Sequence, residues 1–171
     1  FENKSVRNAK NAWVPTTHWL GGFCWHYVMR ANRENFRYDL SNVHDESLQY
    51  TVYGEGEYYG WHTDADLGSS YTPIGDFQKS GSNTVEQLQT DEFLRNSETV
   101  RKLSFSLLLS DPDTYQGGNF EFKGVNEKVY LAPRHRGTII LFDSRTKHRV
   151  TKVTKGIRKS IVGWVVGPRW K

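Results

Sequence analysis

The feature that most constrains the fold of this chain is the alternation of apolar and polar residues in many short runs. In most of these runs every second residue is apolar, which indicates a β-strand with one face buried. The runs are 36–40, 48–52, 103–109, 120–122, 129–131, 138–142 and 157–166, and the turn-forming clusters between them include 54–56, 111–113, 117–118, 133–137 and 155–156. Many short strands with regular turns predict a mainly β domain, either a β-sandwich or a jelly roll.

One segment near the N-terminus has a helical period instead. Its apolar residues recur three and four positions apart, which places them on one face of an α-helix. They are Leu20, Phe23, Cys24, Tyr27, Val28 and Ala31. Gly21 and Gly22 weaken the first turn, because glycine is a poor helix former. We therefore expect one amphipathic helix that flanks the β core.

Length and composition limit the classes of protein that this chain can belong to. Its 171 residues suit one domain, 1–171, and its 14% of aromatic residues can form a packed core. No run approaches the roughly 18 apolar residues of a membrane span, so we expect no membrane partner. The single cysteine, Cys24, excludes an internal disulfide and favours a reducing, cytoplasmic location. The net charge of +4 is too small to require a nucleic-acid partner.

The segment 67–100 does not fit the strand pattern. It is polar and rich in Gly and Ser, with one short helix expected near Thr84, where Gln87 occupies the capping-box position. A loop of this length inside one domain is usually functional or disordered.

The strongest local sign of chemistry is the pair His62 and Asp64. On an extended strand these side chains project from the same face, about 6–7 Å apart, so both can reach one metal ion. Alone, the pair is better explained as exposed polar residues near a strand end. His148 supplies a third candidate ligand just after a buried-looking run. Two histidines and one carboxylate match the facial triad of non-haem Fe(II) oxygenases, which leaves coordination positions open.

Arg158 is the second sign. In the run 157–166 it shares a face with Ser160, Val162 and Trp164 by the strand period of two. A buried guanidinium needs an anionic partner, and no carboxylate is near it in sequence. A ligand carboxylate held as a bidentate pair would satisfy it, and so would an acidic side chain from another strand.

These residues belong to two ordered motifs, Tyr53-x-x-Gly56-x-x-Tyr59-x-x-His62-x-Asp64 and His148-Arg-Val-x-x-Val-x-x-Gly156-x-Arg158. Together they resemble the Fe(II)- and 2-oxoglutarate-dependent dioxygenases of the prolyl 4-hydroxylase superfamily. The segment 101–118 and the ending 163–170 are similar to the bacterial and phage branch called PKHD-type hydroxylases. That branch carries Arg at the position of Arg158, where collagen-type members carry Lys. The resemblance extends from about residue 31 to the C-terminus.

The resemblance implies a double-stranded β-helix, which is a jelly roll whose open end holds the metal, with the N-terminal helix packed outside. It implies that Fe(II) is bound by His62, Asp64 and His148. The cosubstrate 2-oxoglutarate would be bound by Arg158, Tyr53, Trp164 and either Ser104 or Ser106. The loop 67–100 would be a lid over the substrate.

The implied reaction uses O2 and converts 2-oxoglutarate to succinate and CO2 while a protein or peptide is hydroxylated, with prolyl residues as the leading targets. Ascorbate is a further candidate cofactor. The expected setting is the cytoplasm of a bacterium, with a phage gene as one origin. The oligomeric state is open, and a monomer is compatible with the sequence.

Two other functions compete with this hypothesis. The sequence pI of about 9.1 would suit an oxidative dealkylase of nucleic acids of AlkB type. Such enzymes typically carry a second arginine six residues after the cosubstrate arginine, and this chain has Trp164 there. The other alternative is a non-catalytic jelly-roll module with a structural metal. A structural site would close its coordination shell, whereas this ligand set leaves it open.

Overall fold

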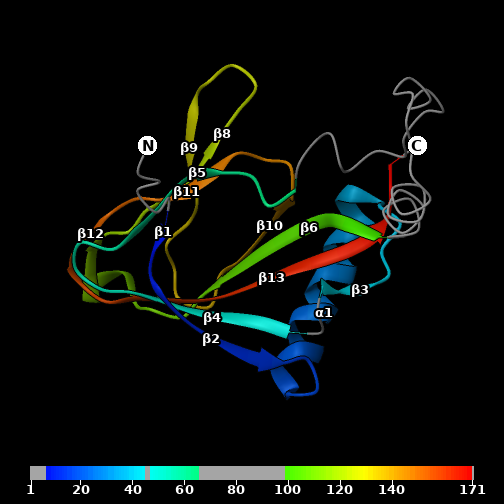
Figure 1. The fold of residues 1–171 in the computed structure, drawn as a ribbon, viewed down its shortest axis with the longest axis horizontal. Helices are drawn as coiled ribbons and strands as arrows, with labels where there is room; N and C mark the ends of the chain where they lie inside the picture. Colours follow the sequence, from blue (N-terminus) through cyan, green and yellow to red (C-terminus); the bar gives the residue numbers. More distant parts are fainter. Residues whose placement is uncertain (1–6, 45–46, 66–98, 171) are drawn as a thin grey trace, which may run out of the picture.

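The computed structural model describes residues 7–44, 47–65 and 99–170. The chain forms a mainly antiparallel β structure with one long helix, as Figure 1 shows. The strands are β1 (Arg7–Asn8), β2 (Lys10–Pro15), β3 (Asn42–Val43), β4 (Ser47–Tyr53), β5 (Tyr58–His62), β6 (Thr99–Leu108), β7 (Tyr115–Gly117), β8 (Phe120–Lys123), β9 (Val129–Leu131), β10 (Ile139–Asp143), β11 (His148–Val150), β12 (Val153–Gly156) and β13 (Arg158–Pro168). The helical elements are α1 (Trp19–Ala31), a π-helical turn (Asn32–Phe36) and a 3-10 turn (Pro112–Thr114).

The strands form two main sheets. The six-stranded sheet has the order β10-β6-β13-β4-β2, and its sixth strand, β3, pairs with β13. The five-stranded sheet has the order β1-β5-β11-β8-β9. The short pair β12-β7 forms a third sheet. Most neighbours in this order are far apart in sequence, and the paired strands are antiparallel, as in a jelly roll, which confirms the predicted fold class.

The main core lies between α1 and one face of the six-stranded sheet. Cys24 and Val28 of the helix are fully buried and pack with Leu48, Leu103 and Phe105 of the sheet. Figure 1 shows α1 crossing the sheet beside β6 and β13. The opposite face of this sheet is therefore free to line the interior of the jelly roll.

The helix begins one residue before the predicted apolar stripe, and its buried face is narrower than predicted. Phe23 and Tyr27 are each 40% exposed, although the stripe assigned them to the core. The buried side is instead Gly21, Cys24 and Val28. A Cβ at Gly21 would overlap the backbone carbonyl of Thr16, so the glycine allows the helix to pack closely against the preceding turn.

The strand predicted at 36–40 is wrong. Residues 32–36 form a π-helical turn that continues α1, and Arg37 adopts a left-handed backbone conformation with φ of 56°. The backbone of Tyr38 bonds to the side chain of Asn32 and not to a neighbouring strand. The Asn32 amide donates to the Tyr38 carbonyl at 2.9 Å, and the Asn32 side-chain oxygen accepts from the Tyr38 amide at 2.8 Å. Phe36, Tyr38 and Leu40 still pack against the core, which explains their alternation.

The inner face of the six-stranded sheet is set by strand register. Arg158, Val162 and Trp164 of β13 lie opposite Tyr53 of β4, Ser106 of β6 and Ser104 of β6, respectively. Small hydroxyl-bearing residues here leave space where core strands usually carry large apolar side chains. Among the described residues, no helix is long and apolar enough to cross a membrane.

Candidate metal centre and cosubstrate cavity

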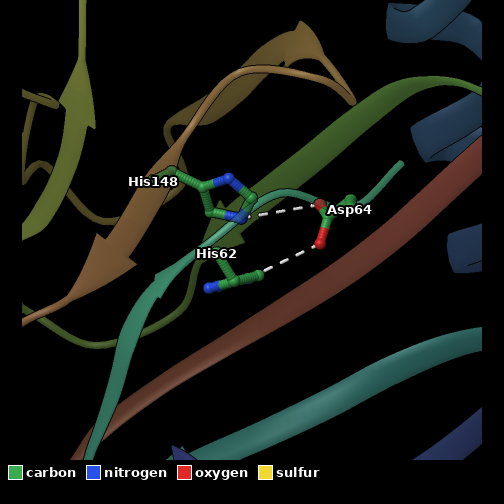
Figure 2. Close-up of side chains that lie close together, drawn as sticks. All are labelled: His62, Asp64 and His148. Carbon is green, nitrogen blue, oxygen red and sulfur yellow. Dashed lines mark ion pairs between the residues drawn. The ribbon is translucent and has the colours of Figure 1, made fainter. Parts of the chain in front are cut away.

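Three potential metal ligands converge at the end of β5. His62 closes β5, Asp64 follows two residues later, and His148 opens β11 directly opposite His62 in the antiparallel pair. The Nε2 atoms of His62 and His148 each lie 3.5 Å from a different carboxylate oxygen of Asp64. Figure 2 shows both imidazoles beside this carboxylate. All three ligand atoms lie within 4.8 Å of one another, so one ion could contact all of them.

The backbone fixes the position of Asp64 after the strand ends. The amides of Asp64 and Ala65 both donate to the Ser144 carbonyl, at 2.9 and 3.0 Å. Ser144 belongs to the turn between β10 and β11, so this bond ties the carboxylate-bearing segment to the segment that leads into His148. Asp64 and His148, which are 84 positions apart in sequence, are thereby held close together.

Each histidine has one ring nitrogen occupied and one available. Nδ1 of His62 lies 2.8 Å from the Gly60 carbonyl, and Nδ1 of His148 lies 2.8 Å from the Thr146 carbonyl. A carbonyl only accepts, so each Nδ1 carries the proton and donates it, and each Nε2 keeps its lone pair for a metal. The donor set of two imidazoles and one carboxylate therefore fits a divalent ion such as Fe(II).

Electrostatics favour the metal-binding protonation states. Burial alone would raise the pKa of Asp64, but the adjacent imidazoles of His62 and His148 hold its pKa below the ordinary value. Burial is the main cause that lowers the pKa of His148. An ionised carboxylate and a neutral imidazole are the forms that bind a cation.

Aromatic rings surround the cluster. Tyr59 stacks on His62 with ring centroids 3.6 Å apart, and Phe142 packs edge-on against His148 at 4.7 Å. Phe120 contacts His148 from a third side at 5.7 Å. These rings restrict the imidazoles to their orientations and keep water away from the histidines on those sides.

A cavity runs from the three ligands to Arg158. Arg158 is 3% exposed, and its Nη1 donates to Ser160 Oγ at 3.1 Å. The guanidinium also contacts the hydroxyl of Tyr115 and the ring of Tyr53. Among the described residues no carboxylate pairs with it, so the alternative of a salt bridge to another strand finds no support there. Burial lowers the pKa of this guanidinium, since it disfavours the charged form.

Of the other residues predicted to bind the cosubstrate, three line the cavity and one does not. Tyr53, Trp164 and Ser106 line the cavity together with Arg158. Ser104 is fully buried outside the lining, where its hydroxyl lies 2.9 Å from Ser144 Oγ and contacts the Asp64 carboxylate. The structure therefore places Ser106 in the cavity and Ser104 beside the metal ligand. The predicted lid 67–100 and the helix near Thr84 lie outside the described residues, except that Thr99 and Val100 begin β6.

Two polar residues that line the cavity were not predicted from the sequence. Gln49 is 4% exposed and lines the cavity from β4, and Arg7 reaches it from the two-residue strand β1. Gln49, Thr51 and Tyr53 alternate along β4, a polar pattern that could have identified the cavity-facing side of this strand. A two-residue strand has no period, so nothing in the sequence could have indicated Arg7.

A jelly roll with two histidines and one carboxylate at its open end defines the class of non-haem metal oxygenases. Residues 48–166 match the family model of the 2OG-Fe(II) oxygenase superfamily, and the chain belongs to this family. The family implies Fe(II), 2-oxoglutarate and O2.

Named relatives agree with the branch that the motifs indicated. A PKHD-type hydroxylase of Synechococcus elongatus is 47% identical over 64 residues, which cover 37% of this chain and 28% of the relative. Another, from Picosynechococcus, is 32% identical over 120 residues, which cover 70% of this chain and 41% of the relative. The chain thus spans less than half the length of these two relatives.

Solved structures agree on the fold. A prolyl hydroxylase in complex with a hypoxia inducible factor oxygen degradation domain peptide fragment from Trichoplax adhaerens superposes with a TM-score of 0.64. The superposition covers 96% of this chain and 65% of that chain at 16% identity. At this identity the likeness shows the fold alone.

Proposed function

We propose that this chain is a 2-oxoglutarate-dependent hydroxylase of protein or peptide substrates, with prolyl residues as its leading targets. The observation that carries the proposal is Arg158, a buried cation without a carboxylate partner among the described residues, in the same cavity as His62, Asp64 and His148. Such a cation is costly unless a ligand supplies the missing anion. A dicarboxylate that reaches from the metal ligands to Arg158 satisfies both ends of the cavity.

Each cavity residue has a role in this proposal. His62, Asp64 and His148 hold Fe(II), which supplies the activation of O2 and the oxidation of 2-oxoglutarate to succinate and CO2 when it is bound. Arg158 binds the distal carboxylate through its planar fork of donors. Tyr53 and Ser106 donate hydroxyl hydrogen bonds to the cosubstrate, and Trp164 forms an apolar wall beside it.

The protein's contribution beyond binding is orientation and exclusion of water. The Nδ1 hydrogen bonds of His62 and His148 fix both imidazoles, so that each Nε2 would be available to hold the ion. Tyr59 and Phe142 cover the histidines and keep the reactive site dry on their sides. Ascorbate would complete the proposed set of cofactors as a reductant.

The proposed substrate class is supported by named relatives and by the chain itself. The Trichoplax structure is described as a prolyl hydroxylase with a bound peptide, and the curated relatives are described as hydroxylases. Trp164 occupies the position at which nucleic-acid dealkylases carry a second arginine, and it lines the cavity as an apolar wall. Both points favour a peptide over an alkylated base.

The test uses this chain with Fe(II), 2-oxoglutarate, ascorbate and O2. A panel of proline-containing peptides is compared with an alkylated DNA oligonucleotide, and succinate is measured in parallel. We expect succinate and a mass gain of one oxygen on at least one peptide, with neither in His148→Ala. Loss of an alkyl group from DNA would replace the peptide assignment, and failure of the metal-loaded chain to bind 2-oxoglutarate would overturn the proposal as a whole.

A further inference from the structure

A second, smaller cavity lies against Arg158. Ser106, Phe120 and Arg158 line both this cavity and the one that reaches the metal ligands, so they form a shared wall. The smaller cavity is lined on its other sides by residues that include Tyr115 and Arg134. None of its lining residues is acidic, although two of them are arginines.

Tyr115 connects the two arginines. It is 4% exposed at the start of β7, and its hydroxyl hydrogen bonds with the Arg158 side chain. On its ring face lies the Arg134 guanidinium, with Cζ 4.6 Å from the ring centroid. A planar guanidinium held on an aromatic face is restricted in orientation. Arg134 is therefore positioned next to the group that contacts Arg158.

Arg134 has only neutral partners among the described residues. Its Nη1 donates to Asn119 Oδ1 at 2.8 Å, and its Nη2 donates to the Tyr115 carbonyl at 3.4 Å. Its Nε is buried and has no hydrogen-bond partner there. No acidic side chain among the described residues pairs with Arg134, which is half-buried, or with Arg158, which is buried.

We infer that Arg134 is a specificity-determining positioning residue, whose charge behind Arg158 makes this end of the cavity select a cosubstrate with a distal carboxylate. The inference rests on the proposed function and extends it to a residue that does not face the metal ligands. Two nearby cations repel each other in the empty cavity, and a bound carboxylate relieves this repulsion. A 2-oxo acid without the distal carboxylate gains nothing from it.

The ratio of two dissociation constants tests this role. The protein is loaded with Mn(II), so that it binds 2-oxo acids without turnover. Calorimetry then compares the binding of 2-oxoglutarate with that of 2-oxopentanoate, the five-carbon 2-oxo acid that lacks the distal carboxylate. We expect Arg134→Gln to weaken 2-oxoglutarate about tenfold while 2-oxopentanoate changes little. Arg134→Lys keeps the charge and should restore most of the selectivity. Arg136→Gln, an exposed arginine two residues away, is the matched control.

The outcomes separate the inference from the proposed function. Equal weakening of both acids in Arg134→Gln would mean a structural role and would overturn the inference. So would a ratio equal to that of Arg136→Gln, or a Lys variant that behaves like the Gln variant. If the wild-type protein bound neither acid, the proposed function itself would fail.

Discussion

Arg158 and Tyr53 lie directly opposite each other in the β13–β4 pair, with Cζ of the guanidinium 5.6 Å from the centroid of the phenol ring. Both side chains are 3% exposed, so water contributes little to stabilising the cation. The register of two antiparallel strands therefore creates a buried end of the cavity that favours an anionic ligand.

Replacement of Arg158 by Gln should weaken binding of 2-oxoglutarate about 100-fold, because two charge-assisted hydrogen bonds are lost. The melting temperature of the variant without ligand should not fall below that of the wild type, since the variant removes a buried charge that has no carboxylate partner. Calorimetry with 2-oxoglutarate measures the first effect. Lys159→Gln, the exposed neighbour on β13, should bind like the wild type. A dissociation constant within threefold of the wild-type value would exclude Arg158 from the cosubstrate site.

Removal of a metal ligand should abolish stabilisation by the ion. A ligand that binds only the folded state raises the melting temperature, and a tighter ligand raises it further. We expect added Mn(II) to raise the melting temperature of the wild-type protein and to leave that of His148→Ala unchanged. His135→Ala replaces an exposed histidine in a turn and should respond like the wild type. If Mn(II) raised the melting temperature of His148→Ala as much as that of the wild type, the ion would bind elsewhere.

Much of this site was predictable because its residues lie at strand positions with simple periods. Arg158 and Trp164 share a face of β13 by the period of two. His62 and Asp64 are also two apart, but β5 ends at His62, and the backbone bonds to Ser144 hold the carboxylate beside it. His62 and His148 are 86 positions apart in sequence, so no local pattern predicts that they lie together. Only the antiparallel register of β5 and β11 brings them together, and the family motif supplied that information in advance.

The parts that sequence could not provide depend on tertiary packing. Residues 36–40 alternate like a strand, yet the side chain of Asn32 holds Tyr38 while Phe36 and Leu40 pack into the core. Phe23 and Tyr27 fit the helical stripe but lie where nothing in the described chain covers them fully. The choice between Ser104 and Ser106 likewise required the position of the cavity.

Ser104 and Ser106 should have different functions despite their shared face of β6. Ser104 contacts the Asp64 carboxylate, so Ser104→Ala should weaken metal binding by roughly tenfold, as is typical for residues that support a ligand. Ser106 lines the cavity, so Ser106→Ala should weaken 2-oxoglutarate by a few-fold, about the effect of one neutral hydrogen bond. Titrations with Mn(II) and with 2-oxoglutarate distinguish the two. Equal effects of both variants on both ligands would contradict the assignment.

Gly118 should be required for the position of Arg158. Its backbone has φ of +58°, and a Cβ there would lie 3.1 Å from Cδ of Arg158 and 2.9 Å from a methyl group of Val153. Gly118→Ala should therefore displace the guanidinium and weaken 2-oxoglutarate about tenfold. Gly56→Ala is the control, since its φ of +83° imposes comparable backbone strain in open space. Both variants should lose about 1 kcal/mol or more of stability, but weaker cosubstrate binding in the Gly56 variant would assign the effect to strain alone.

Stability in acid should depend on Asp143. Its carboxylate accepts hydrogen bonds from the Tyr38 hydroxyl at 2.8 Å and from Nη2 and Nε of Arg145 at 2.6 and 2.9 Å. Burial by itself would raise its pKa, but the Arg145 contacts and the Tyr38 hydrogen bond outweigh it and hold the pKa below the ordinary value of 3.8. Ionised Asp143 therefore stabilises the fold at pH above 3.8, and this stabilisation is lost as the pH falls through the lower pKa of the folded state.

Asp143→Asn should reduce the free energy of unfolding by about 1–2 kcal/mol at pH 7, where the wild-type carboxylate is ionised and hydrogen-bonded. The difference from wild type should start to shrink below pH 3.8, where the carboxyl of the unfolded chain takes up a proton first, and should shrink further as the pH falls through the lower pKa of the folded state. Urea unfolding between pH 3 and pH 7 measures both effects. Asp111→Asn, at an exposed turn, is the matched control for the loss of a carboxylate. A constant difference across the whole range would mean that the Asp143 charge does not contribute, and that the loss comes from packing.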